Sequence, residues 1–298
     1  MILVVGATGY LGSEICRRLR ANGETVRGLV RPGAKRENEI KDMGVEISHG
    51  DLKDPASVER ACQGVSSVIS TATCIVSRRP GDTFEKVDRD GQLGLVKLAK
   101  RSGVQHFVFI SVAPGTPSNL TFVRCKRQVE AAIRENGMTW TVLQPGPFME
   151  TMFSALAGWD FEKGKVRIVG SGKVPKSLIS LHDVAAFAVL AVQRPEMQGR
   201  NIPLGGPEAL SMLDAVKIFE EVTERSPKVS HAPVAVLKIA SVVIRPFNPF
   251  LATILTLASG AERPDAVDMT ATLAEFPVKL TSVREFAEKL TTEDAVNP

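Results

Sequence analysis

Cysteine, net charge and long apolar runs are all scarce in this 298-residue sequence. The four cysteines are scattered without a C-x-x-C pair, which argues against a zinc site and against a disulfide framework; they are Cys16, Cys62, Cys74 and Cys125. Charged residues make up 23% of the chain and leave a net charge of +4, too little for a nucleic-acid-binding surface. We therefore expect no metal site, no nucleic-acid partner, and reduced cysteines in a cytoplasmic protein.

The most apolar stretch, 234–260, contains no uninterrupted run of about 18 apolar residues, the length that spans a membrane. Lys238, Arg245 and two prolines divide it, so two short helices are predicted there. We expect these helices to pack in the core of a small lobe; the alternative is that they lie on a membrane surface. The chain opens with a strand-like run, Ile2 to Val5, so we expect no secretion signal.

Strand-like and helix-like segments alternate through the first half of the chain. Predicted strands lie at residues 2–5, 25–30, 45–48, 65–70, 106–110 and 139–143, with amphipathic helices between them. Such alternation is typical of a parallel sheet, and near-continuous apolar strands such as ILVV and FVFI are typical of a sheet covered by helices on both faces. The sequence therefore predicts a doubly wound α/β fold.

A glycine-rich segment follows the first predicted strand and opens an amphipathic helix; it reads Gly6-Ala7-Thr8-Gly9-Tyr10-Leu11-Gly12. Glycines here permit a tight turn, close approach of the backbone to a pyrophosphate, and close packing of the helix on the strand. The helix N-terminus presents N–H groups to the anion. This order of elements predicts a Rossmann-type dinucleotide site, to which Gly6, Thr8, Gly9, Tyr10, Leu11 and Gly12 contribute.

The end of the second predicted strand indicates which dinucleotide binds. NAD-binding proteins carry an acidic residue about 20 positions after the loop, which binds the adenine ribose. Here the strand ends with Arg31 and Pro32, without a carboxylate. Arg31 has a planar donor group suited to the 2′-phosphate of NADP(H), and Lys35 and Arg36 add charge. We therefore expect NADP(H), bound by Arg31 and Lys35; an Arg31 that only faces solvent is the alternative.

The regular alternation ends after Pro145-Gly-Pro147. We predict a Rossmann domain over 1–145 and a smaller substrate or partner lobe over 146–298, from which elements at about 178–205 return to the sheet. These elements are a helix that starts near Asp183 and a strand at 200–204. Ser282 and Glu285 have the spacing of a capping box and predict a last helix.

Four segments resemble one family: GATGYLG at 6–12, LVRPGAK at 29–35, GDLKD at 50–54, and TFVRCKRQVEAAIRENGMTWTVLQPGPFME at 121–150. By these segments the chain resembles the NmrA-like atypical short-chain dehydrogenases/reductases. The resemblance implies that Asp51 and Leu52 flank the adenine. It also implies that three residues after the fourth strand lie beside the cofactor and four others near the nicotinamide, namely Thr71, Ala72 and Thr73, and Pro145, Gly146, Pro147 and Phe148.

Members of this family include isoflavone reductase-like enzymes and quinone reductases, but also a cofactor-sensing regulator and proteins that assist photosystem assembly. The fold alone therefore does not name the reaction. Typical short-chain dehydrogenases use a Tyr-x-x-x-Lys pair, but the only tyrosine here is Tyr10, inside the glycine loop, and Phe122 stands four residues before Lys126. The usual general acid is missing.

Lys126 interrupts an apolar stripe on its predicted helix, because it shares a face with Phe122, Val129 and Ile133. Burial of an ammonium group is unfavourable unless an anionic or hydrogen-bonding group receives it. We predict that Lys126 contacts the cofactor ribose or takes part in proton transfer; a lysine that reaches out to solvent at the edge of the stripe is the alternative.

Ser111 ends the fifth predicted strand, at the sheet edge where α/β folds bind ligands, so it is predicted to bind substrate or cofactor; a simple turn serine is the alternative. His182 and Asp183 resemble an acid/base pair, but Asp183 is better explained as a helix cap. No metal-binding pattern stands out among the remaining titratable residues.

We favour an NADPH-dependent reductase of a hydrophobic or aromatic small molecule, such as a quinone, an enone or a carbonyl compound, with Lys126 and Ser111 at the catalytic centre. The alternative is a non-catalytic NADP(H)-binding sensor or assembly factor. In that case the 234–260 segment would contact a protein partner or a membrane surface.

Overall fold

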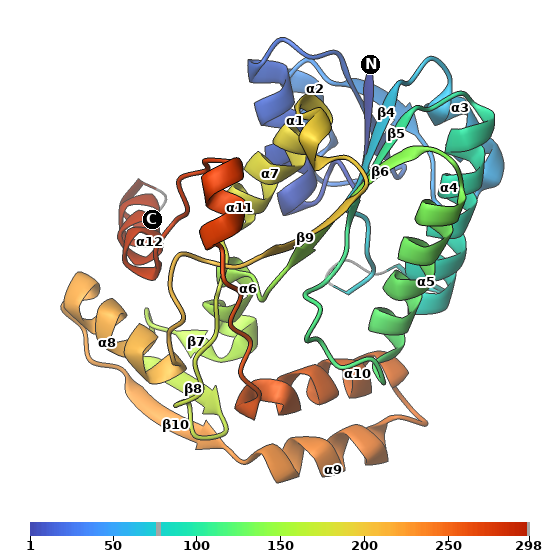
Figure 1. The fold of residues 1–298 in the computed structure, drawn as a ribbon. Helices are drawn as coiled ribbons and strands as arrows, with labels where there is room; N and C mark the ends of the chain where they lie inside the picture. The colour runs from blue at the N-terminus through green and yellow to red at the C-terminus, as the bar shows by residue number, and fades with distance from the viewer. Residues whose placement is uncertain (76–78, 297–298) are drawn as a thin grey trace. The chain divides into compact units, whose positions relative to one another are not determined.

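The computed structural model describes residues 1–75 and 79–296, and the chain divides into two compact units (Figure 1). The first unit consists of Met1–Gln144 and Val184–Ile202. The second consists of Pro145–Asp183 and Pro203–Pro298. The assignment of the second unit to a substrate or a partner remains a prediction.

A seven-stranded sheet in the order β3-β2-β1-β4-β5-β6-β9 organises the first unit. Its strands are β1 (Ile2–Val5), β2 (Val26–Val30), β3 (Glu46–His49), β4 (Ser67–Ser70), β5 (His106–Ile110), β6 (Thr139–Pro145) and β9 (Arg200–Leu204). Strands β1 to β6 pair with their neighbours in parallel. The six predicted strands and the predicted returning strand are all present, and the doubly wound α/β fold is confirmed.

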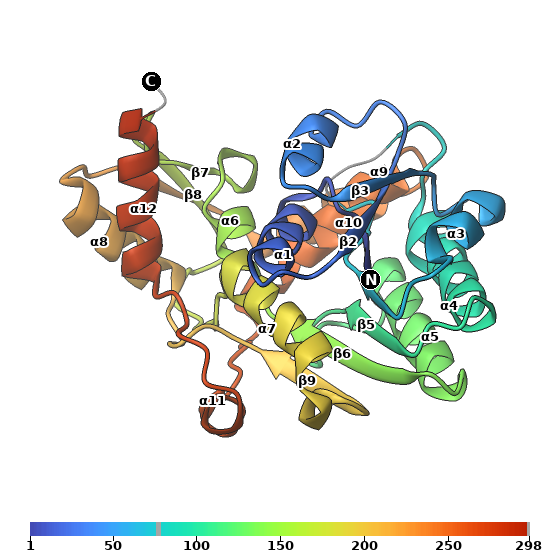
Figure 2. The same cartoon turned by 90° about the horizontal axis from the view of Figure 1, so that it is seen from above.

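Helices cover both faces of this sheet, with α1 and α7 on one face and α3, α4 and α5 on the other (Figure 2). The helices of this part of the chain are α1 (Tyr10–Ala21), α2 (Glu37–Asp42), α3 (Pro55–Cys62), the π-helix η1 (Phe84–Gly91), α4 (Gln92–Arg101), α5 (Thr121–Glu135), α7 (Leu181–Gln193) and the 3-10 helix η3 (Pro195–Met197). Central strands between the two layers are therefore buried on both faces: all four residues of β1 and all five of β5 are buried.

Strand order reverses at β1, because the chain builds outward to β2 and β3 and then returns to place β4 on the other side of β1. Val5, the last residue of β1, pairs with Leu29 of β2 and Ser70 of β4. The loops after β1, β2 and β4 therefore leave the same edge of the sheet. In open α/β sheets this reversal point is where ligands bind.

The second unit has a three-stranded sheet in the order β10-β8-β7 and a separate apolar core. An aromatic cluster stands at the centre of this core: the ring of Phe153 lies 4.8 Å from that of Trp159 and 4.9 Å from that of Phe219. The elements are α6 (Met149–Met152), η2 (Ala155–Ala157), β7 (Trp159–Asp160), β8 (Lys165–Val169), α8 (Met212–Thr223), β10 (Lys228–Ala232), α9 (Val234–Ile244), α10 (Pro249–Ala258), η4 (Ser259–Glu262), α11 (Thr270–Glu275) and α12 (Val283–Val296). The predicted capping box opens α12, since Glu285 N–H donates to Ser282 Oγ and Ser282 N–H to Glu285.

The 234–260 segment forms two helices separated at the prolines, as predicted, but the prediction that they are core helices is wrong for α9. Val242 is 72% exposed and Ile239 is 65% exposed, whereas the buried residue of α9 is Ser241. The helix is apolar on nearly every side, so packing one side leaves the other side in solvent. No helix in the described residues is both long enough and apolar enough to cross a bilayer.

Candidate functional site

The glycine loop after β1 is shaped so that side chains are excluded at two positions. Gly6 has a φ of +89°, in the left-handed region, and a Cβ built on Gly12 would lie 2.1 Å from the carbonyl oxygen of Gly6. The Gly9 N–H donates to that same carbonyl over 2.9 Å, which closes the turn. Glycine at 6 and 12 is therefore required for this close approach of loop and helix.

Helix α1 begins at Tyr10, directly after this loop, and its first turn is left open to an anion. Its N-cap residue, Gly9, provides no side-chain hydrogen bond, and the first turn contains no acidic residue. The first N–H groups of a helix have no partner within the helix and attract negative charge. The loop and helix therefore fit the pyrophosphate of a dinucleotide.

The segment after β4 runs beside the glycine loop and is fixed from two sides. Thr71 donates to the Val5 carbonyl through both its N–H (2.9 Å) and its hydroxyl (3.1 Å), while Gln92 Nε2 donates to the Ala72 carbonyl over 2.9 Å. A Cβ on Gly6 would lie 2.6 Å from Thr71 Oγ1. Thr71 and Ala72 thus lie against the loop, and Thr73 follows them in the chain. Their position beside a bound cofactor remains a prediction.

Two cations share a buried carboxylate at the end of β2. Arg31 lies 3.1 Å from Asp82, and Lys53 binds the other oxygen of the same carboxylate. Burial alone would raise the pKa of Asp82, but the hydrogen bonds from Lys53 and the Arg79 amide, with the charges of Lys53 and Arg31, outweigh it and lower the pKa. Arg31 is therefore held in place by Asp82, and its side chain remains 30% exposed. Asp82 was not predicted as a site residue.

The two adenine-flanking positions lie close to this cluster in the chain. Asp51 accepts a hydrogen bond from the Lys53 N–H over 2.9 Å, and Leu52 is buried. A Cβ on Gly91, at the end of η1, would come within 2.9 Å of the Leu52 Cβ. Leu52 therefore packs closely on the π-helix, while its contact with an adenine remains a prediction.

Arg36, rather than Lys35, lies at the start of α1. Its guanidinium stands 5.0 Å from the centre of the Tyr10 ring and donates to Ser13 Oγ over 3.0 Å, while Glu39 accepts two further bonds. Its Nη1 atom is buried and has no hydrogen-bond partner in the described chain. Lys35 is exposed. A buried donor without a partner at the start of α1 fits a phosphate oxygen of a bound dinucleotide.

Lys126 of α5 is 6% exposed and directs its ammonium group to the end of β5. Nζ donates to the carbonyl oxygen of Ile110 over 2.9 Å and lies 5.0 Å from the centre of the Phe109 ring. Burial lowers the pKa of Lys126; the negative charges of Asp88 and Glu130 oppose the shift without cancelling it. The predicted stripe is confirmed, because Phe122, Val129 and Ile133 are buried beside it.

Asp88 is a buried carboxylate in the π-helix η1, which packs on α5. Its Oδ2 accepts a hydrogen bond from the Cys74 N–H over 3.1 Å, whereas Oδ1 has no partner among the described residues. Asp88 thus connects the segment after β4 to the surroundings of Lys126. Asp88 was not predicted as a site residue, although it lies four residues after Phe84 and seven before Leu95 and so interrupts an apolar stripe as Lys126 does.

Ser111 donates to Glu130 Oε1 over 2.5 Å, so its hydroxyl proton points to α5. Arg127 (2.5 Å) and Gln144 Nε2 (3.2 Å) donate to the same oxygen. Burial would raise the pKa of Glu130, but these bonds and the Arg127 charge lower it. The arrangement explains Ser111 as part of a buried polar network; a catalytic role for Ser111 remains a prediction.

Pro145 to Phe148 lie at the start of the second unit and are fixed there by backbone bonds. Gly146 N–H donates to the Leu204 carbonyl over 2.8 Å, and the Pro147 carbonyl accepts from Ile179 over 3.0 Å. A Cβ on Gly146 would lie 3.0 Å from the Ser177 carbonyl, so the close approach favours glycine. Their role near a nicotinamide remains a prediction.

The explanation of Asp183 as a helix cap is wrong. The carboxylate that caps α7 is Glu150, which accepts from the Leu181 N–H at 3.0 Å and from Ser180 Oγ at 2.8 Å. Asp183 instead accepts from Thr281, through its N–H at 2.8 Å and its hydroxyl at 2.9 Å. This contact lies within the second unit and joins residues 98 positions apart, which sequence spacing could not reveal.

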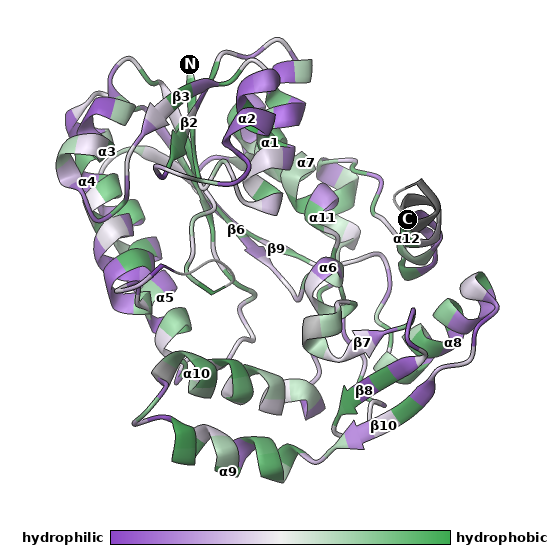
Figure 3. Ribbon diagram, turned by 180° about the vertical axis from the view of Figure 1, so that it is seen from behind, coloured by the Kyte–Doolittle hydropathy of each residue, from purple (hydrophilic) through white to green (hydrophobic). Residues whose placement is uncertain are grey.

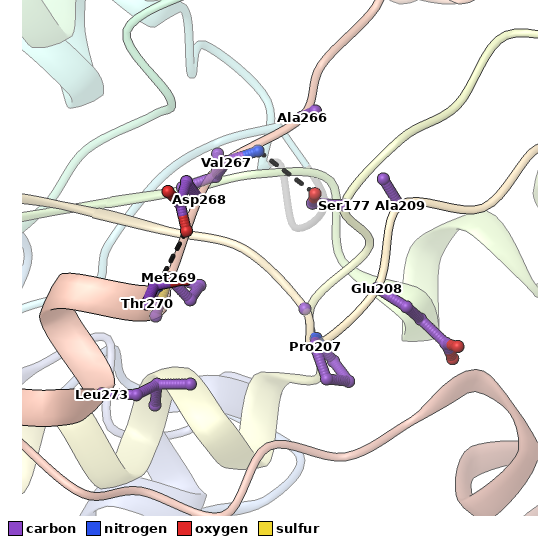
Figure 4. A pocket seen from close by; sticks show the side chains of 11 residues that line it. Ser177, Pro207, Glu208, Ala209, Ala266, Val267, Asp268, Met269, Thr270 and Leu273 are labelled. Atoms are coloured by element: carbon purple, nitrogen blue, oxygen red, sulfur yellow. Dashed lines mark hydrogen bonds between the residues drawn. The ribbon is translucent and has the colours of Figure 1, made fainter.

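The second unit has a hollow of about 400 Å³ between 206–209 and 266–273 (Figure 4). Polar groups around it bond to one another: Ser177 Oγ accepts from the Val267 N–H over 3.1 Å, and Asp268 Oδ1 accepts from the Thr270 N–H over 2.9 Å. None of the predicted site residues lines this hollow, and we assign no chemistry to it.

Comparisons with known proteins agree with this geometry. A family model described as the NmrA-like family matches residues 1–287. The NAD(P)H azoreductase of Xenophilus azovorans is 36% identical over 215 residues, which is 71% of this chain and 70% of that protein. Photosystem II assembly factor Ycf39 of Trieres chinensis is 29% identical over 243 residues, 80% of this chain and 74% of its own length.

Among solved structures, the NADPH-dependent quinone oxidoreductase QOR2 of Escherichia coli, complexed with NADPH, has a TM-score of 0.77. It is 20% identical, and the alignment covers 98% of this chain and all of that one. At this identity the likeness shows a common fold.

Proposed function

Because this chain belongs to the NmrA-like family, we propose that it is an NADP(H)-dependent reductase of a small hydrophobic acceptor. The observation that carries the proposal is that a glycine loop opening a helix and a buried lysine stand at the carboxyl ends of strands in one parallel sheet. The azoreductase relative, at 36% identity, supports the reductase class.

In this proposal the glycine loop and the start of α1 hold the pyrophosphate. Arg36 and Arg31 bind the 2′-phosphate, Arg31 by sharing its guanidinium between the phosphate and Asp82. β2 and the two residues after it contain no acidic residue that could serve as the ribose acceptor of NAD-specific proteins, and the nearby Asp82 is occupied by Arg31 and Lys53. NADP(H) is therefore the cofactor that these side chains fit.

When bound, NADPH supplies the hydride. Lys126 supplies the matching proton from Nζ to the oxygen or nitrogen of the acceptor on which negative charge develops. The lowered pKa of Lys126 favours this transfer, because burial destabilises the charged ammonium form relative to the neutral amine. The negative charge of Asp88 raises the pKa of Lys126, but Asp88 accepts no hydrogen bond from Nζ. We therefore assign Asp88 a positioning role.

Acceptors of this kind include quinones, enones, carbonyl compounds and azo compounds, all of which take a hydride at one atom and a proton at another. We also propose a cytoplasmic location.

The second candidate is an NADP(H)-binding assembly or sensor protein without turnover. The resemblance to the photosystem II assembly factor favours it.

A turnover assay separates the two candidates. NADPH oxidation would be followed with a quinone, an azo dye, an enone and an aromatic aldehyde, alongside a fluorescence titration of NADPH binding. A reductase oxidises NADPH with at least one acceptor and forms equimolar reduced product. Tight NADPH binding without turnover on any acceptor would contradict the reductase and support the second candidate.

A further inference from the structure

Helix α9 turns its apolar side outward. Val236, Ile239, Val243 and Phe247 are 57%, 65%, 62% and 87% exposed, and their spacing of three and four residues puts them in one stripe along the helix and its C-terminal turn. Ser241, the buried residue of α9, faces the other way. Figure 3 shows most of α9 coloured as hydrophobic, with α10 beside it. We call the exposed stripe the α9 face.

Contiguous exposed apolar surface on a folded protein marks a contact with a partner or a membrane. The α9 face consists of aliphatic side chains and one phenylalanine, without tyrosine, tryptophan or a hydrogen-bonding group. Protein interfaces are enriched in aromatic residues and arginine and contain many hydrogen bonds. This composition favours the acyl region of a lipid layer over a protein surface.

The charge around the α9 face has one sign. Between Glu224 and Glu262 the chain contains no acidic residue, but it contains four cations, Arg225, Lys228, Lys238 and Arg245. Lys238 of α9 and its C-cap residue Arg245 are exposed and seven residues apart, so they share one flank of the helix, with the exposed Val242 between this flank and the α9 face. The structure places none of the four in an ion pair with another described residue. A helix with an apolar face and a basic flank is suited to a membrane with anionic headgroups.

We propose that the α9 face is a membrane-docking surface that binds peripherally to bilayers containing anionic lipid. The helix lies in the plane of the interface, with Ile239 and Val243 among the acyl chains and Lys238 and Arg245 at the phosphates. At 11 residues α9 is too short to span a bilayer, so the contact is peripheral. The proposal does not depend on the proposed reductase activity.

The test uses the full chain and vesicle flotation. Vesicles of phosphatidylcholine alone are compared with vesicles that also contain phosphatidylglycerol, at low and high salt. Wild-type protein is expected to float with the anionic vesicles and to dissociate as salt rises. Lys238→Glu together with Arg245→Glu should weaken binding at least about 25-fold, about fivefold for each cation lost. Val243→Glu should abolish it.

Lys173→Glu is the matched control, because Lys173 is an exposed lysine of the same unit outside this segment. It should leave flotation nearly unchanged, and equal thermal midpoints would show that the variants fold. Absence of wild-type flotation with either vesicle type would overturn the proposal, as would flotation that Val243→Glu does not reduce. A concentration-dependent dimer that Val243→Glu dissociates would also overturn it, because a second copy would then cover the α9 face.

Discussion

The candidate cofactor site has one end at the carboxyl end of β2 and the other at the carboxyl end of β5, and the cations at these two ends differ in burial and in pairing. At the end of β2, Arg31 and Lys53 are partly exposed and share the carboxylate of Asp82 directly. At the end of β5, Lys126 is buried, and its hydrogen bond goes to an uncharged carbonyl. Partly exposed cations beside a carboxylate can also contact an incoming anion, whereas burial lowers the pKa of the Lys126 ammonium group and favours release of its proton. The first arrangement suits recognition and the second suits chemistry.

The largest effect is expected at the chemical end. Lys126→Met removes the proton donor, so turnover should fall by about 10² to 10⁴-fold, the usual contribution of a general acid. NADPH affinity should change far less. Arg124→Met, an exposed cation on the same helix, is the control and should stay near wild type. A Lys126→Met variant with wild-type turnover and wild-type cofactor affinity would remove Lys126 from the mechanism.

The second-largest effect, on NADPH binding, is expected from a substitution in the glycine loop, which in our proposal holds the pyrophosphate between the two ends of the site. Gly12→Ala places a methyl group against the Gly6 carbonyl, so loop and helix must separate. The dissociation constant of NADPH should rise on the order of 100-fold, or about 2.7 kcal/mol. Gly94→Ala in α4, where a Cβ would meet open space, should have no such effect. Equal behaviour of the two variants in an NADPH titration would argue against pyrophosphate binding at this loop.

At the recognition end, Arg31→Asp should weaken NADPH binding more than NADH binding, by roughly 1 to 3 kcal/mol, because a charge-assisted hydrogen bond to the 2′-phosphate is lost. Arg36→Met and Lys35→Met, compared in the same calorimetric titrations, measure which neighbouring charge contributes. The position of Arg36 at the start of α1 predicts the larger loss for Arg36→Met. If Arg31→Asp weakens both cofactors equally, Arg31 does not read the 2′-phosphate.

The smallest effect concerns Asp88, whose negative charge raises the pKa of Lys126 against the lowering by burial. In Asp88→Asn the pKa of Lys126 should fall further. Because the protonated lysine is the active form, the alkaline loss of activity should then begin at lower pH, by about one pH unit, which corresponds to about 1.4 kcal/mol. Asp90→Asn, at an exposed position of the same π-helix, should leave the pH profile in place. An unshifted profile in Asp88→Asn would show that Asp88 only supports the segment after β4.

The fold could be predicted from the sequence because local patterns and global topology agree in the first unit. Apolar strands, amphipathic helices and the glycine loop each specify the same architecture, and the stripe containing Lys126 was predicted with its buried neighbours. The partners of these residues could not be predicted. Asp82 reaches Arg31 across 51 positions and Thr281 reaches Asp183 across 98, distances over which periodicity contains no information.

The 234–260 segment shows a second limit of sequence reasoning. Its hydrophobic pattern and prolines predicted two helices correctly, but hydrophobicity alone does not determine whether other elements bury these helices. Burial depends on the packing of the whole unit, whose core is filled by aromatic residues from other elements. The exposed side of α9 could therefore be recognised only in three dimensions.

One measurement tests the reductase assignment most directly. The protein would be incubated with NADPH deuterated at the transferring position and with a mixture of small metabolites, and the products would be searched by mass spectrometry for molecules that gain deuterium. Our account predicts a labelled product whose formation is abolished in Lys126→Met while both proteins still bind NADPH. Tight binding of NADPH by the wild-type protein with no labelled product would contradict it.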